Sequence, residues 1–134
     1  MVEVVKIRGI DSVSGVPQDP AHGDQLREVS ALQADEAVAV GASLLDVREP
    51  EEYDAGHAPL ATSIPLGELG QRIAELPRDA LIVCVCRSGV RSAAAAVALV
   101  TADFDAVNLA GGMHAWAADG LPIVTANGAP GTVI

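Results

Sequence analysis

The stretch IVCVCRSGVRS, residues 82–92, brings two cysteines and two arginines together, and no other segment concentrates so many groups able to do chemistry. Cys86 ends an apolar run, and Arg87, Gly89 and Arg91 follow before an alanine-rich segment begins. The reactive form of cysteine is the thiolate, which is favoured by cationic neighbours and by the unpaired amides at a helix N-terminus. Gly89 lets the intervening loop curl so that its N–H groups converge. The pattern predicts a nucleophilic thiolate and an anion site at Cys86.

Cys84 lies two residues before Cys86 in the same apolar run. Residues at this spacing in a strand are about 6.6 Å apart, near the upper limit for a disulfide, so no bridge is expected. Two cysteines are also too few for a zinc site. The favoured interpretation of Cys84 is an inert core thiol, and the alternative is a resolving thiol that recaptures oxidised Cys86.

The overall composition narrows the function classes. The 134 residues suffice for one domain, and at 50% hydrophobic but 2% aromatic residues its core must consist of Ala, Val, Leu and Ile. A net charge of −10 argues against nucleic-acid binding. We interpret the acidity as a solubility feature, with an acidic surface that docks a basic protein as the alternative. The N-terminus lacks a signal-like apolar core and no apolar run is long enough to span a membrane, so we expect a cytoplasmic protein with reduced thiols.

Apolar and helical patterns alternate regularly once the chain has passed its first residues. Strands are expected at residues 26–30, 43–48, 61–65, 80–86 and 105–110, and helices at 33–41, 49–57, 66–76, 92–102 and 111–120. This alternation predicts an α/β domain with a mostly parallel five-stranded sheet and helices on both faces.

Three regions follow from composition and periodicity. Residues 1–25 are rich in Pro, Gly, Ser and Asp and predict an N-terminal extension or linker, which includes a short strand at Val2–Ile7. The domain occupies residues 26–124, and residues 125–134 predict a flexible C-terminal tail. Ligands of such sheets bind beyond the carboxyl ends of the strands, an edge that Asp46 and Arg48 should share with Cys86.

Four successive segments resemble the signatures of a single rhodanese domain: LLDVREPEEYDAGHAP, SIPLGEL, IVCVCRSGVRSA and NLAGGMHAWAADGLPI. The resemblance extends from about Leu26 to Val124, in the family's order and spacing. One departure is Leu60, where the family commonly has Gly, and this touches no catalytic position.

The resemblance implies a sulfurtransferase fold and activity of the thiosulfate:cyanide class. Cys86 would take a sulfane sulfur from a donor, become a persulfide, and pass the sulfur to a small nucleophile such as cyanide or a thiol, with ping-pong kinetics. The loop amides of Arg87, Ser88, Gly89, Val90 and Arg91 would cradle the outer sulfur, and the arginines would attract an anionic donor such as thiosulfate. No metal or organic cofactor is implied.

Two rival functions remain open. One is a sulfur-relay module that delivers persulfide sulfur to a protein partner in cofactor synthesis or tRNA thiolation, because CRSGVRS resembles loops attached to adenylyltransferases. The other is a phosphatase or arsenate reductase, whose related loops carry Cys-x5-Arg. Cys86 and Arg91 form the shorter Cys-x4-Arg, which favours sulfur over a tetrahedral oxyanion.

Several further residues have weaker signals. Asp46 and Arg48 are expected either to brace the active loop as an ion pair or to form a rim salt bridge. Trp116 is expected to wall the pocket mouth or to anchor a helix on the sheet, and His57 to pin its turn rather than to transfer protons. The acidic residues Glu49, Glu51 and Glu52 are interpreted as a solvated first helical turn.

Overall fold

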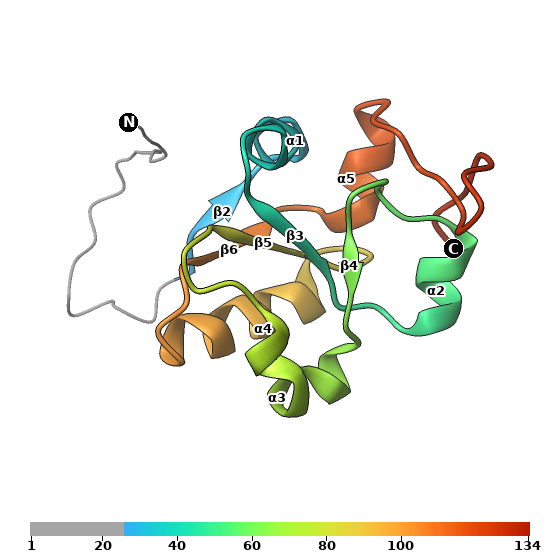
Figure 1. Cartoon of the computed structure of the whole chain (residues 1–134). Coiled ribbons are helices and arrows are strands. Elements are labelled where there is room, and N and C mark those ends of the chain that lie inside the picture. Colours follow the sequence, from blue (N-terminus) through green and yellow to red (C-terminus); the bar gives the residue numbers. More distant parts are fainter. Residues whose placement is uncertain (1–25) are drawn as a thin grey trace.

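The computed structural model describes residues 26–134, so the predicted extension at 1–25 and its strand at Val2–Ile7 lie outside the described residues. Five strands form one sheet in the order β2-β6-β5-β3-β4, and every neighbouring pair is parallel (Figure 1). The predicted α/β architecture is therefore confirmed, with a sheet that is parallel throughout rather than mostly so.

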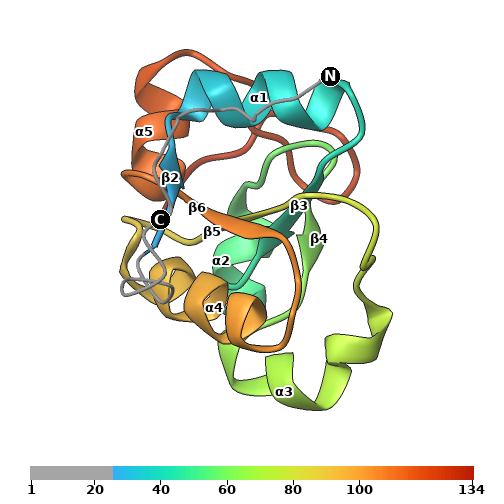
Figure 2. The ribbon, with the colours of Figure 1, turned by 90° about the vertical axis from the view of Figure 1, so that its left-hand side faces the viewer.

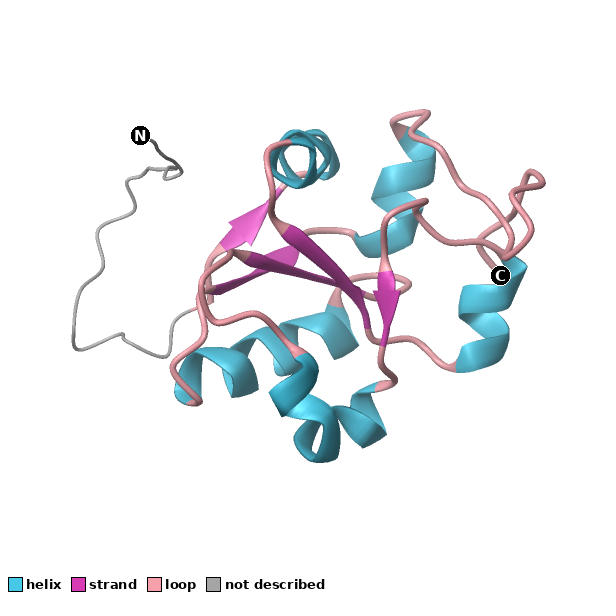
Figure 3. Ribbon diagram, viewed as in Figure 1, coloured by secondary structure: helices cyan, strands magenta, loops and turns pink. Residues whose placement is uncertain are grey.

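The strands and helices alternate along the chain as expected (Figure 3). The strands are β2 (Glu28–Val29), β3 (Ser43–Asp46), β4 (Thr62–Ser63), β5 (Ile82–Val85) and β6 (Ala106–Leu109). The α-helices are α1 (Ala31–Ala39), α2 (Pro50–Ala55), α3 (Leu69–Arg72), α4 (Val90–Thr101) and α5 (Gly112–Ala118), and two 3-10 turns, Leu66–Glu68 and Ile73–Glu75, flank α3.

Local sequence explains where the first two helices begin. The Gln33 amide donates a hydrogen bond to the Ser30 hydroxyl at 3.1 Å, and the Ser30 amide donates one to the Gln33 side-chain oxygen at 2.9 Å. Together these two bonds cap α1. Pro50 opens α2 at its first position, where an N–H would have no partner within the helix. Glu49 and Glu52 form a second capping box across that start, which places Glu52 on the first turn of α2.

The helices cover both faces of the sheet (Figure 2). Buried side chains form one apolar cluster on each face. In the α4-side cluster, residues from α3 and α4 such as Leu69 and Leu99 pack on the strands. In the α1-side cluster, residues from α1 and α5 such as Ala34 and Met113 pack on the other face. Every residue of β5 is buried, which explains why its sequence is apolar without alternation.

The continuous helix predicted over residues 66–76 is wrong. The segment instead divides into a 3-10 turn, the four-residue helix α3 and a second 3-10 turn. Gly67 and Gly70 both lie in this stretch, and each glycine disfavours a helix interior by about 1 kcal/mol relative to alanine. Leu69 and Leu76 nevertheless pack in the α4-side cluster, so these apolar positions of the segment are buried although it is not one continuous helix.

The final residues turn back across α2. The strand bridge between His57 and Val124 brings the chain to this helix, and the Thr132 amide donates to the Ala55 carbonyl at 2.9 Å. The predicted flexibility of residues 125–134 stays a prediction, while their path places them beside α2. Within residues 26–134, no helix is both long and apolar enough to cross a bilayer.

Candidate active site

Cys86 stands at the carboxyl end of the central strand β5, between the flanking strands β3 and β6. The chain then makes a tight turn, and α4 begins at Val90. Gly89 is the residue before the helix and has φ +106°, a left-handed conformation that other residues rarely adopt. The predicted strand, turn and helix therefore place the thiol at the start of α4.

The Cys86 sulfur accepts two hydrogen bonds from this turn. The Gly89 amide donates at 3.1 Å and the Ser92 hydroxyl lies 3.3 Å away. Burial by itself raises the pKa of Cys86, but the Ser92 hydroxyl and the amides of Ser92, Gly89 and Ser88 lower it further than burial raises it. The net result is a thiol whose pKa lies below its ordinary value, as a nucleophilic sulfur requires.

The surface above Cys86 comes from the loop. Cys86 itself is only 1% exposed, whereas Arg87, Ser88 and Val90 are exposed. Val90, the first residue of α4, has 76% of its surface exposed. The sulfur is therefore covered, and the exposed side chains at this turn belong to residues that follow Cys86 in the chain.

Helix α5 supports the loop from behind through its first turn. The Met113 amide donates to the Cys86 carbonyl at 2.8 Å and the His114 amide donates to the Arg87 carbonyl at 3.1 Å. Gly112 has φ +61°, and a Cβ there would lie 2.5 Å from the Cys86 carbonyl oxygen. Gly112 therefore lets the backbone of α5 come into contact with the backbone of the Cys86 loop.

Arg91 does not stand free beside the sulfur. Its guanidinium makes a two-bond ion pair with Glu52 of α2, at 2.7 and 2.9 Å. The Arg91 hydrogen bond is the main reason why the pKa of Glu52 falls to about 2, although burial opposes the shift. The Glu52 side chain is only 17% exposed, so its interpretation as part of a solvated turn is wrong. The sequence held no local signal for this pair.

Arg87 differs from Arg91. Its Nε donates to the main-chain oxygen of Ile134 at 2.7 Å, which brings the end of the chain to the loop. No carboxylate side chain within residues 26–134 forms a salt bridge with it. Within the described residues, Arg87 is therefore bonded to a main-chain oxygen, whereas Arg91 is bonded to an acidic side chain.

Asp46 and Arg48 form a fully buried ion pair at the end of β3, with Nη2 of Arg48 2.7 Å from Oδ2 of Asp46. Arg48 also donates to the Gly56 carbonyl at 2.8 Å. Among the described residues, no hydrogen bond joins this pair to the Cys86 loop. The pair instead bonds Gly56 at the end of α2, the helix that carries Glu52, and β3 itself lies beside β5 in the sheet.

Trp116 lies in the α1-side cluster, whereas the Cys86 side chain lies in the α4-side cluster on the other face of the sheet. Its indole N–H donates to the Pro122 carbonyl at 2.8 Å, and only 2% of the residue is exposed. The prediction that Trp116 walls the Cys86 pocket is therefore wrong, and its contacts fit the alternative of a helix anchor.

His57 bonds the Tyr53 carbonyl through Nδ1 at 2.7 Å and stacks on the Tyr53 ring, contacts that pin its turn.

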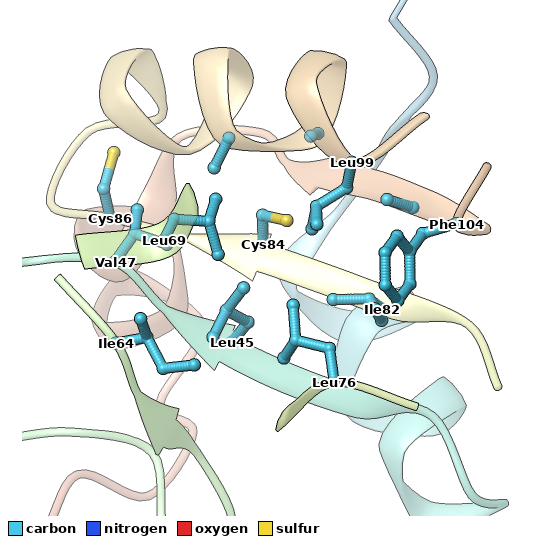
Figure 4. Close-up of a cluster of buried hydrophobic side chains, with 13 residues drawn as sticks. Leu45, Val47, Ile64, Leu69, Leu76, Ile82, Cys84, Cys86, Leu99 and Phe104 are labelled. Carbon is cyan, nitrogen blue, oxygen red and sulfur yellow. The ribbon is translucent and has the colours of Figure 1, made fainter. Parts of the chain in front are cut away.

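Cys84 shares a face of β5 with Cys86, and both side chains point toward α4 (Figure 4). Cys84 is completely buried, and desolvation, with a smaller contribution from Cys86, raises its pKa to about 12. These contacts favour the inert core thiol over the resolving thiol. The two cysteines of one strand thus have opposite pKa shifts, because only Cys86 reaches the amides of the loop.

Comparison with known proteins places this geometry in a family. Residues 25–119 match the Rhodanese-like domain. A protein of Allochromatium vinosum named Sulfurtransferase is 42% identical over 86 residues, which cover 63% of this chain and 80% of that protein. MoeZ of Mycobacterium tuberculosis, named as an adenylyltransferase/sulfurtransferase, is 47% identical over 78 residues, 56% of this chain but only 20% of MoeZ.

A solved structure agrees with these sequence matches. The rhodanese-related protein of Thermoplasma volcanium superposes with a TM-score of 0.70 at 34% identity, covering 73% of this chain and 97% of that one. The matched region contains the strand, loop and helix that hold Cys86. This chain belongs to the family of rhodanese-like domains.

Proposed function

We propose that this protein is a sulfurtransferase that moves a sulfane sulfur from an anionic donor such as thiosulfate to a small thiophilic acceptor through a persulfide on Cys86. The rhodanese-like domain and its sulfurtransferase-named relatives support sulfur transfer in general. The observation that carries the proposal for Cys86 is the hydrogen bonding of its sulfur by the Gly89 amide and the Ser92 hydroxyl at the start of α4.

The transfer consists of two displacements at sulfur. The Cys86 thiolate attacks the outer sulfur of thiosulfate, a new S–S bond forms, and sulfite leaves with the electron pair of the bond that breaks. The negative charge then rests on the outer sulfur of the persulfide. Cyanide attacks that sulfur, thiocyanate departs, and the electron pair of the Cys86–sulfur bond returns to Cys86 as a thiolate. A thiol acceptor would leave instead as a persulfide.

Groups of the Cys86 loop match the charges that arise in these two displacement steps. The Gly89 amide at the start of α4 donates to the Cys86 sulfur, and amides at a helix N-terminus favour negative charge near them. Arg87 supplies an exposed positive charge for an anionic donor, whereas Arg91 is occupied by Glu52. The occupied Arg91 also weakens the phosphatase alternative, because an arginine that must clamp a tetrahedral oxyanion would have to leave its carboxylate partner.

A second candidate is the sulfur relay, in which a protein takes the persulfide sulfur. Two observations favour it: the 47% identity to part of MoeZ, and the exposed apolar side chain of Val90 at the start of α4. An apolar residue at the rim would contact a partner protein that covers the loop. The relay shares the first displacement with the enzyme and differs only in the acceptor.

Initial-rate kinetics with thiosulfate and cyanide test the enzyme proposal. A persulfide intermediate predicts parallel double-reciprocal lines when one substrate is varied at several fixed concentrations of the other. Persulfide formation without turnover to cyanide or small thiols would favour the relay. A Cys86→Ser variant with unchanged turnover would overturn both proposals.

A further inference from the structure

Asn108 is a buried polar residue on the largely apolar face of the sheet that α4 covers. In β6 it lies on the α4 side together with Ala106, and its Cα is paired with that of Cys84 in the register of β5. The residue is only 1% exposed. Because a buried amide destabilises a fold unless its polar atoms are paired, the partners of Asn108 matter.

The Asn108 side chain is fully engaged. Nδ2 donates to Oε2 of Glu28 at 2.9 Å and to the carbonyl of Gly89 at 3.1 Å, while Oδ1 lies 2.6 Å from the hydroxyl of Ser92. Both groups near Nδ2 are pure acceptors, so the amide has one allowed orientation. Oδ1 must therefore face Ser92 as an acceptor.

The two residues held by Asn108, Gly89 just before α4 and Ser92 in its first turn, are the same two that donate to the Cys86 sulfur. Gly89 offers its amide at 3.1 Å and Ser92 its hydroxyl at 3.3 Å. The Ser92 hydroxyl has one proton and two acceptors within reach, Cys86 Sγ and Asn108 Oδ1. Asn108 thus contacts both residues that donate to the sulfur.

We infer that Asn108 is a positioning residue for Cys86. Its side chain fixes Gly89 and Ser92, and its Oδ1 is the second of the two acceptors between which the Ser92 proton moves. When Cys86 is a thiolate, Ser92 donates to the sulfur. When Cys86 carries the persulfide, its inner sulfur is uncharged and Ser92 donates to Asn108. This second state rests on the proposed function, whereas the positioning of the free thiol does not.

Several charged residues near Cys86 could also change its ionisation, and the test must leave them in place. Arg91 of α4, which interacts electrostatically with Cys86, is paired with Glu52 of α2. Arg87 follows Cys86 in the loop, and Glu28 of β2 stands beyond Asn108. Substitutions of Asn108 or Ser92 by alanine leave all four charges in the chain. A change in the ionisation of Cys86 would therefore report on the hydrogen-bonded network.

The test measures the Cys86 pKa in the full chain from thiolate ultraviolet absorbance, subtracting the titration of the matching Cys86→Ser protein. We expect Asn108→Ala to raise the pKa, because both donors lose their anchor, and Ser92→Ala to raise it by about one unit, a roughly ten-fold loss of thiolate below the pKa. Val107→Ala removes a buried neighbour of Asn108 on the opposite face of β6 and is the matched control. It should lower stability without moving the pKa.

A Cys86 pKa that is unchanged or lowered in Asn108→Ala, with a reduced melting temperature, would overturn the inference, because Asn108 would then only fill space or compete for the proton. Ser92→Ala keeps a good helix former in α4 and carries the test if Asn108→Ala does not fold. An unchanged pKa in Ser92→Ala would also overturn it. The titration contains no sulfur donor, so its result does not depend on whether the sulfurtransferase proposal is right.

Discussion

The backbone of Gly112 lies against the carbonyl group of Cys86 so closely that no side chain fits between them. Met113 and His114, the next residues of α5, donate to the carbonyls of Cys86 and Arg87. The helix therefore supports the turn from which the thiol projects. This contact joins two segments of the chain that lie side by side only because β6 neighbours β5.

Gly112→Ala should damage both stability and activity. The new Cβ would lie 2.5 Å from the Cys86 oxygen, and φ +61° is strained for alanine, so unfolding should require at least ~1–2 kcal/mol less free energy. Because the loop must shift, kcat/KM with thiosulfate should fall about ten-fold or more. Gly70→Ala is the matched control, since its Cβ meets nothing within 4 Å. Equal effects of the two substitutions in denaturation and kinetics would refute the close contact.

Glu52→Gln should destabilise the protein at neutral pH and much less in acid. A carboxyl whose pKa falls from 4.5 to about 2 on folding stabilises the fold above pH 4.5, and this contribution is lost as the pH falls toward 2. We expect a loss of ~1–2 kcal/mol at pH 7, limited by the partial exposure of Arg91.

Urea denaturation at pH 7 and at pH 3 measures this pair directly. The difference between wild type and Glu52→Gln should shrink by about half or more at pH 3. Glu51→Gln changes the same charge on an exposed neighbour of the same helix and should cost little at either pH. A Glu52→Gln effect no larger than that of Glu51→Gln would show that the ion pair does not stabilise α2 against the loop.

Arg87→Glu should weaken the use of thiosulfate. Replacing an exposed positive charge at the rim by a negative one removes a charge-assisted contact and adds repulsion, so KM for thiosulfate should rise about ten-fold or more. Arg27→Glu makes the same charge change next to Asp105, at the edge where the strands begin. If steady-state kinetics give the same KM for both variants, Arg87 does not bind the donor.

The sequence patterns predicted those features that depend on neighbouring residues. Apolar runs identify the strands, and the change from IVCV to an alanine-rich helix places Cys86 at the rim. The Arg91–Glu52 pair and the network of Asn108 could not be predicted this way, because their partners lie 39 and 80 residues apart and meet only through strand order. Trp116 shows the same limit, since periodicity does not tell which face of the sheet a helix covers.

The central claim is that Cys86 carries the transferred sulfur, and intact mass after incubation with thiosulfate tests it most directly. The parent protein and Cys84→Ser should each gain the mass of one sulfur atom and lose it on addition of cyanide, because Cys84 is a buried thiol whose pKa is raised to about 12. Cys86→Ser should gain none. A sulfur atom that is still gained by Cys86→Ser, or that is absent from the parent protein, would contradict the account.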